Sequence, residues 1–156
     1  MLEVTAMRAR GVRGFTLIEL LVVITIAGVM LAIGIPSFRE FIASQRVKSA
    51  SYELATSLLM ARSEAIKRRA NVTVAPVTAD TWTSGWNVTA GGGTVQSQQE
   101  LPGMTITTAV STITFQSTGR PTTTSVGTFE ITSNGKTRCV RLDSAGSAST
   151  STGACS

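Results

Sequence analysis

The sequence predicts an α+β protein in which one long N-terminal helix precedes a single β-rich domain. An apolar run of 21 residues extends from Phe15 to Ile35, and apolar residues then recur at spacings of three and four between Val47 and Ala65. Both patterns are typical of helices. After Asn71 the composition changes to Thr, Ser, Val and Gly with few charges, which favours strands. A chain of 156 residues leaves room for one globular domain on this helix.

The apolar segment, residues 15–36, is long enough to cross a membrane. An ideal helix over the 21 apolar residues extends about 32 Å, close to the roughly 30 Å of hydrocarbon in a bilayer. The run is longer than the apolar core of a secretory signal peptide, and no Ala-x-Ala cleavage pattern follows it. We therefore expect this helix to remain on the mature chain.

A basic leader, residues 1–14, precedes the apolar run and contains three Arg and one Glu. Its positive charge is expected to stay on the cytoplasmic side, which places everything after Pro36 across the membrane. Processing between Gly14 and Phe15 would remove this leader and lower the formal net charge by two units, from +5 to +3. The mature side chains would then be only mildly basic.

The residues around this position resemble the type IV prepilin signature. Gly14 stands at the last position of the leader, Phe15 at the first position of the mature chain, and Glu19 at the fifth. The resemblance implies cleavage after Gly14 by a dedicated prepilin peptidase and N-methylation of Phe15.

Glu19 is the one carboxylate within the apolar run. A carboxylate inside a membrane helix costs several kcal/mol unless it is paired, hydrated or protonated. The functional interpretation is that Glu19 pairs with the α-amino group of Phe15 of a neighbouring subunit as helices stack into a filament. The alternative is an interfacial residue that reaches water near the helix end.

The helix is expected to continue over residues 37–70 as an amphipathic segment. Pro36 lacks a backbone donor and disfavours helix in the residue before it, so we expect a kink or local melting there. Beyond it, an apolar stripe requires a sheet to cover one face. The stripe consists of Val47, Ala50, Leu54, Leu58, Ala61 and Ala65.

The β-rich domain is expected over residues 71–156. Asn134-Gly135 predicts a two-residue hairpin, because both residues tolerate positive φ. Gly91-Gly92-Gly93 has no following helix pattern and is typical of a flexible turn. The predicted strands are Val72 to Val77, Gly85 to Thr89, Thr94 to Gln99, Met104 to Val110, Thr112 to Gln116, Gly127 to Ser133 and Thr137 to Leu142.

Cys139 and Cys155 both fall in the exported part of the chain, where oxidation is permitted. An even count near the C-terminus favours a disulfide, which would stabilise the fold by roughly 3 kcal/mol in the loop-entropy model. Two free thiols are the alternative. The tail from Ser144 to Ser156 has too little apolar content to order itself, so only the bridge is expected to hold it.

Two later segments resemble FimT/GspH-like minor pilins. Met60 to Arg68 is similar to the family's helix-ending segment, and Gly119-Arg120-Pro121 is similar to its turn between strands. The resemblance implies a pilin-like fold, with a long bent helix packed on a Thr-rich, antiparallel, two-sheet β domain. It also implies other pilin subunits as partners and incorporation in small numbers near a filament tip.

These features predict a minor type IV pilin, a structural subunit that initiates or tips a pilus. Its expected location is the bacterial inner membrane, which it crosses once, with the globular domain in the periplasm until it is assembled. The alternative is a minor pseudopilin of a type II secretion system, which shares the same signature and domain.

No enzymatic activity, cofactor or metal is expected. Histidine is absent, and no paired carboxylates stand at a recognisable spacing. The two cysteines lack a partner base or a metal-ligand set, and no serine lies in a nucleophile motif. The composition therefore favours an assembly protein.

Double-stranded DNA is a further candidate partner. Some FimT-like members bind DNA through a Gly-Arg-x-Arg motif, and Gly135-Lys136-Thr137-Arg138 is similar to it, with Lys in place of the first Arg and Arg141 nearby. In a strand, Lys136 and Arg138 share a face and could contact phosphates in a salt-dependent way. The alternative is solvated charges that protect an edge strand from aggregation.

Two other clusters favour structural roles. Lys67, Arg68 and Arg69 lie at the predicted end of the helix, where the helix dipole favours cations, with a ligand patch as the alternative. Trp82 and Trp86 are expected to pack in the core or at a sheet edge, with a binding platform as the alternative.

Overall fold

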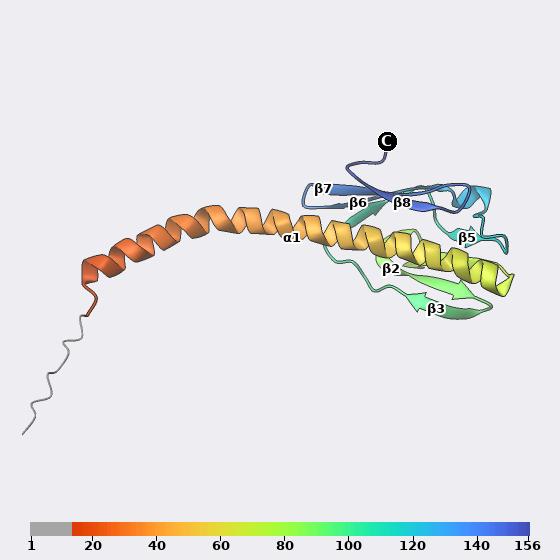
Figure 1. Cartoon of the computed structure of the whole chain (residues 1–156), viewed down its shortest axis with the longest axis horizontal. Coiled ribbons are helices and arrows are strands. Elements are labelled where there is room, and N and C mark those ends of the chain that lie inside the picture. Colours follow the sequence, from red (N-terminus) through yellow and green to blue (C-terminus); the bar gives the residue numbers. More distant parts are fainter. Residues whose placement is uncertain (1–13) are drawn as a thin grey trace, which may run out of the picture. The chain divides into compact units, whose positions relative to one another are not determined.

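The computed structural model describes residues 14–156, so most of the predicted leader 1–14 lies outside the described residues. One helix, α1, extends over Leu17–Arg68, and the strands follow it (Figure 1). The backbone stays helical through Pro36, so of the two outcomes predicted there local melting is wrong, whereas a kink stays a prediction. The residues on both sides of Pro36 form an unbroken run of helix, and the helical preference of that run outweighs the one backbone hydrogen bond that proline cannot make.

The first part of α1 is apolar and uncovered. Its most apolar stretch of 18 residues has a mean hydropathy of 2.6 and none of it is buried within the chain. Large side chains such as Leu17 and Ile33 are 81% and 70% exposed. By length and composition, α1 can therefore cross a membrane, in agreement with the sequence prediction.

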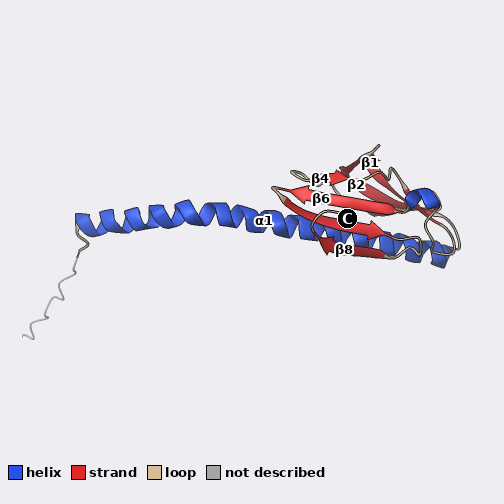
Figure 2. Ribbon diagram, turned by 90° about the horizontal axis from the view of Figure 1, so that it is seen from above, coloured by secondary structure: helices blue, strands red, loops and turns tan. Residues whose placement is uncertain are grey.

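The β domain consists of two four-stranded antiparallel sheets (Figure 2). Sheet A has the order β3-β2-β1-β5, and its strands are β1 (Val72–Thr78), β2 (Thr81–Ala90), β3 (Gly93–Ser97) and β5 (Ile113–Phe115). Sheet B has the order β4-β6-β7-β8, and its strands are β4 (Thr105–Thr107), β6 (Gly127–Ser133), β7 (Lys136–Leu142) and β8 (Ala148–Thr152). A short 3₁₀ helix, η1, covers Thr123–Ser125.

Both predicted turns form two-residue hairpins. Asn134 and Gly135 have φ values of 46° and 74° and join β6 to β7, with Ser133 opposite Lys136. Positive φ at both central residues matches the right-handed twist of the strands, which is why Asn-Gly is favoured there. Gly91 and Gly92 likewise join β2 to β3.

The core lies between the second part of α1 and both sheets. All six residues of the predicted stripe are buried, and they belong to one cluster with the inward side chains of the strands. Trp82 and Trp86 are 1% and 0% exposed, so the core interpretation is confirmed. Trp82 Nε1 donates to the carbonyl oxygen of Val110 at 2.8 Å, and its ring meets Phe129 edge-on with centroids 5.0 Å apart.

Strand existence was predicted better than strand bounds. β6 coincides with the prediction, whereas β2 begins four residues earlier, and β4 and β5 are only three residues long each. The predicted and observed bounds differ most for β2. Its Trp82 lay outside the predicted strand, although this side chain is buried in the core.

The C-terminal tail is ordered, which corrects the prediction for residues 144–156. β8 pairs antiparallel with β7, with Thr150 opposite Val140. Asp143 forms the turn before it, since Asp143 Oδ1 accepts hydrogen bonds from the amides of Ala145 at 2.9 Å and Ser147 at 2.8 Å. Order here comes from backbone pairing with a neighbouring strand, which apolar content does not reveal.

Candidate functional site

The start of α1 is the first candidate site. Thr16 donates two hydrogen bonds to Glu19 Oε2, from its amide at 3.1 Å and from its hydroxyl at 3.0 Å. The amide of Glu19 in turn donates to Thr16 Oγ1 at 3.3 Å. This reciprocal arrangement is a capping box, in which a Thr and a Glu three residues apart satisfy free donors at a helix start. Glu19 therefore has a partner within its own chain.

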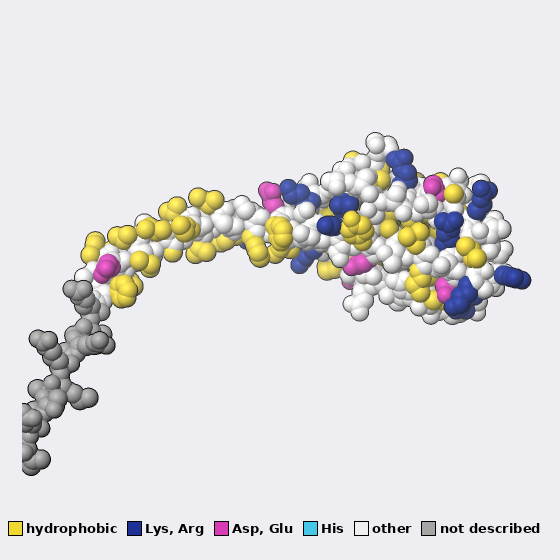
Figure 3. Space-filling model, in the orientation of Figure 1, with side chains coloured by type: hydrophobic (Ala, Val, Ile, Leu, Met, Phe, Trp, Pro, Cys, Tyr) yellow, Lys and Arg dark blue, Asp and Glu magenta, His cyan; other side chains and the backbone are white. Residues whose placement is uncertain are grey.

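Thr16 is the residue of this site that was not predicted from the sequence. The Thr-x-x-Glu pattern directly before an apolar run could have identified it. The surrounding side chains are apolar and open, and Phe15 and Ile18 are 86% and 65% exposed. Figure 3 shows hydrophobic side chains along this part of the helix. The site thus combines an acid at the positive end of the helix dipole with a surface that lacks a partner within the described chain.

The two segments that resemble the minor pilins, the end of α1 and the turn at residues 119–121, lie in contact with each other. Arg62 Nη1 donates to the carbonyl oxygen of Gly146 at 3.1 Å. Gly119 has a φ of +77°, and a Cβ there would lie 2.6 Å from Ile66 Cδ1. Only glycine fits this position without displacing the helix side chain. The helix end and the turn at residues 119–121 are therefore packed together.

The basic cluster at the helix end is neutralised in part by Glu64. Arg68 Nε lies 2.6 Å from Glu64 Oε2, and Lys67 Nζ lies 3.6 Å from Glu64 Oε1. The hydrogen bond from Arg68 holds the pKa of the Glu64 carboxyl below its ordinary value, despite the opposing effect of desolvation. Lys67 and Arg68 lie in the last turn of α1, as predicted, and the favourable effect of the helix dipole on them stays a prediction.

Arg69 ends the helix with a left-handed residue, at a φ of 51°. The amide of Arg69 donates to the carbonyl oxygen of Ile66, and the amide of Ala70 donates to that of Ala65, both at 3.3 Å. This pair of bonds is a Schellman motif with arginine where glycine is usual.

The predicted nucleic-acid face lies at the β6–β7 hairpin. Lys136 and Arg138 share a face of β7, as predicted, and both contact α1. Lys136 Nζ lies 3.0 Å from Glu40 Oε2, and Arg138 Cζ lies 5.5 Å from the ring centre of Tyr52. Arg141 is on the opposite face, where it donates to the carbonyl oxygen of Ser156. The structure therefore brings two of the three predicted cations together and separates the third.

A groove of about 310 Å³ lies beside these two cations. Its cationic side chains are Lys136 and Arg138, and Arg138 Nε is buried without a hydrogen-bond partner among the described residues. The other residues that line it are Ser44, Val47, Gly135, Thr137, Thr152 and Gly153.

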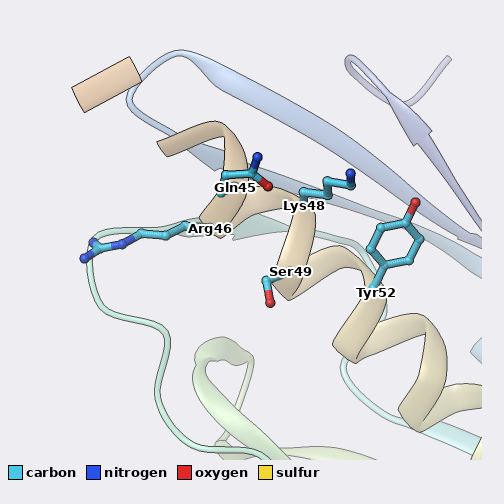
Figure 4. Close-up of a pocket in the computed structure, with 5 residues that line it drawn as sticks. All are labelled: Gln45, Arg46, Lys48, Ser49 and Tyr52. Atoms are coloured by element: carbon cyan, nitrogen blue, oxygen red, sulfur yellow. The ribbon is translucent and has the colours of Figure 1, made fainter. Parts of the chain in front are cut away.

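A second, shallow hollow of about 490 Å³ follows the exposed face of α1. Figure 4 shows its lining on consecutive turns of the helix. The residues are Gln45, Arg46, Lys48, Ser49 and Tyr52. Because every lining residue comes from one helix, this hollow does not enclose a ligand site.

Cys139 and Cys155 form a disulfide with a Cα–Cα distance of 5.0 Å, so the alternative of two free thiols is wrong. The amide of Cys155 also donates to Glu130 Oε2 at 3.2 Å. The bridge closes the segment that contains β8, which stabilises the fold by roughly 3 kcal/mol in the loop-entropy model. In the part of the chain from residue 14 onward, no group of three or more His, Cys, Asp or Glu residues could hold a metal.

Solved structures of two proteins share this architecture. The minor pilin FimU from Pseudomonas aeruginosa, in two crystal forms, matches with TM-scores of 0.61 and 0.56 at 24% and 26% identity. The matches cover 71% and 67% of this chain and 92% and 91% of FimU. The minor pseudopilin EpsH from the Vibrio cholerae type 2 secretion system matches with a TM-score of 0.54 at 18% identity, over 69% of this chain and 97% of EpsH. The chain thus has a pilin-like fold.

Two family models match the sequence itself. Residues 9–35 match the prokaryotic N-terminal methylation motif, which contains Gly14, Phe15 and Glu19. No match was found among curated proteins. Residues 50–146, more than half of the chain, match the family described as type II transport protein GspH. The chain therefore belongs to the GspH family of pilin and pseudopilin subunits.

Proposed function

We propose that this chain is a minor type IV pilin that takes part in the initiation or the tip of a pilus. The observation that carries the proposal is the uncovered apolar first part of α1, which begins within an N-terminal methylation motif. An apolar helix without a partner among the described residues requires lipid or other helices around it. The same surface can therefore serve first as a membrane anchor and then as a contact with neighbouring subunits.

The proposed sequence of events follows from this surface. The anchor holds the precursor in the inner membrane, with residues after Pro36 in the periplasm, and a prepilin peptidase cleaves between Gly14 and Phe15. The new α-amino group of Phe15 is then methylated. During assembly Glu19 leaves its capping box with Thr16 and pairs with Phe15 of an adjacent subunit, because a charge in an apolar filament requires an opposite charge.

The second candidate is a minor pseudopilin of a type II secretion system. The match to the GspH family and the likeness to EpsH favour it, whereas the higher identity to FimU favours the pilus. Neighbouring genes for pilus biogenesis or for secretion would separate the two. A deletion strain tested for both pilus-dependent phenotypes and secretion would do so directly.

DNA binding is not part of the proposed function. Lys136 and Arg138 contact Glu40 and Tyr52 on α1, so each cation already has a partner within the chain. Arg141 lies on the other face of β7, where it contacts the chain's own C-terminus. A phosphate contact would have to compete with these partners.

The Glu19→Ala variant of the full chain tests the proposed assembly role. We expect normal membrane insertion, since the substitution makes the anchor more apolar, and a strong loss of the chain from sheared filaments. Removing one partner of a buried ion pair typically costs about 3–5 kcal/mol, because the other charge is left unpaired. Immunoblots of the membrane and filament fractions would measure both effects.

Glu100→Ala, in an exposed position of the β domain, is the matched control and should assemble normally. Normal recovery of Glu19→Ala in filaments would contradict the proposed pairing.

A further inference from the structure

The two sheets have four edge strands, β3 and β5 in sheet A and β4 and β8 in sheet B. Edge strands present unpaired backbone donors and acceptors, and proteins usually protect them by covering, shortening or bending the edge, or by placing Lys or Pro on it. The four edges of this domain differ in how far they are protected.

Three of the edges are protected. The edge of β5 is covered by the following segment, since the amide of Thr122 donates to the carbonyl oxygen of Thr114 at 3.0 Å and Ser125 Oγ accepts from the amide of Thr114 at 2.9 Å. β4 is only three residues long. The pairing of β3 with β2 has a register shift at Val88 and Thr89, which bends this edge.

β8 has none of these protections. Its five residues, Ala148–Thr152, are all Ala, Ser or Thr, and they pair with β7 without a register shift. The amide of Gly153 donates to the carbonyl oxygen of Thr137, and the amide of Asp143 donates to that of Ser147. These two bonds show which residues of β8 are hydrogen-bonded to β7, because hydrogen-bonded and non-hydrogen-bonded pairs alternate along antiparallel strands.

By this alternation, Ser149 and Ser151 bond to β7, whereas the backbone groups of Ala148, Thr150 and Thr152 point away from the sheet. Within residues 14–156, no other segment supplies hydrogen bonds to these outward groups. An uncovered, neutral edge of regular geometry is therefore available for an additional strand.

A positively charged groove lies at the C-terminal end of this edge. Thr152 belongs to β8 and also lines the groove that contains Lys136 and Arg138. Lys136 is paired with Glu40. Arg138 Nη1 donates to Thr152 Oγ1 at 3.4 Å, but no carboxylate among the described residues forms an ion pair with this arginine. A carboxylate in the groove would balance the charge of the arginine.

We propose that the edge of β8 binds an extended segment of a neighbouring filament subunit, which carries an Asp or Glu whose carboxylate enters the groove beside Arg138. The proposal rests on the proposed function as an assembled subunit. A peptide backbone offers alternating donors and acceptors that match those of Ala148, Thr150 and Thr152, whereas the phosphates of DNA offer acceptors only. The edge therefore suits a protein strand better than nucleic acid.

Cross-linking in the intact organism tests the proposal. p-Benzoylphenylalanine would be placed at the exposed Ser149 of the full chain, and sheared filaments would be irradiated and analysed by mass spectrometry. We expect an adduct with another subunit that maps to an extended, acid-containing segment. The Thr150→Pro change removes an outward amide without breaking a bond to β7, so it should reduce the adduct at least several-fold.

Thr150→Val, which keeps the amide, should leave the adduct unchanged. If Thr150→Pro fails to fold, as judged by circular dichroism of the full chain, Thr150→Lys would block the edge by charge instead. Arg138→Gln should also weaken the adduct, because the carboxylate would lose its charged partner.

The outcomes separate the two proposals. Three outcomes with normal filament recovery would overturn the strand addition alone. These are no adduct, an adduct to DNA, and an adduct that survives both Thr150→Pro and Thr150→Lys. Absence of the unmodified chain from filaments would overturn the proposed function and this inference together.

Discussion

The first and second parts of α1 belong to one continuous helix, yet their apolar residues have different partners. Before Phe38 the large apolar side chains are exposed all around the helix, as Leu17 at 81% and Ile24 at 60% illustrate. From Ala43 onward a single stripe is buried under two sheets, and Leu54 and Leu58 are both 0% exposed. The backbone is the same in both parts, so the difference lies in the side-chain pattern.

This difference shows how a pattern selects a partner. A stripe at spacings of three and four can be covered by the chain's own sheets, while polar residues on the other face stay in water. A helix that is apolar on every side cannot be covered by one domain and requires lipid or other subunits. The second part of α1 thus stabilises the domain, and the first part remains available for assembly.

The largest effect is expected from a substitution in the covered part. Leu58→Ala should lower the free energy of unfolding of the domain by about 2–5 kcal/mol, because it leaves a cavity between the helix and the sheets. Urea unfolding of the full chain in detergent, followed by the fluorescence of the buried Trp82 and Trp86, would measure this loss.

Ile24→Ala in the uncovered part is the matched control and should leave the unfolding midpoint unchanged. An equal loss in both variants would contradict this contrast between the two parts, since it would mean that the first part of α1 also contributes to the stability of the domain.

A smaller effect is expected from the hairpin cations that contact the covered part. The double substitution Lys136→Ala and Arg138→Ala should cost about 1 kcal/mol, the combined contribution of an exposed ion pair with Glu40 and a cation–π contact with Tyr52. We expect duplex-DNA affinity at several salt concentrations to be equally weak before and after the change.

Arg141→Ala, on the opposite face of β7, removes a cation without touching the helix and serves as the control. A salt-dependent DNA affinity that disappears only in the double variant would show instead that these cations bind phosphates.

The smallest effect is expected at the end of the covered part. Arg69→Gly should raise the free energy of unfolding by up to about 1 kcal/mol, because glycine adopts a φ of 51° without strain in the Schellman motif. Arg69→Ala should show no such gain, since alanine keeps the strain and loses only the charge. Thermal unfolding of both variants would distinguish a backbone effect from a charge effect, and equal midpoints would argue against strain at Arg69.

Local patterns predicted much of this structure. The apolar run predicted the exposed part of α1, the stripe from Val47 to Ala65 predicted its buried face, and Asn134-Gly135 predicted a hairpin with the correct two-residue turn. The Thr-x-x-Glu pattern at Thr16 was also present in the sequence, although we identified the capping box only from its hydrogen bonds.

Features that depend on distant segments of the chain became visible only in the folded structure. β8 is ordered because β7 offers it a backbone ladder, Lys136 and Arg138 contact α1 because the hairpin lies beside Glu40 and Tyr52, and Gly119 is restricted by Ile66. Helices and turns could be predicted from the amino-acid sequence, because they depend on neighbours within a few residues. Strand pairing and the contacts of charged side chains join residues that are far apart in the sequence. Only folding brings these residues together.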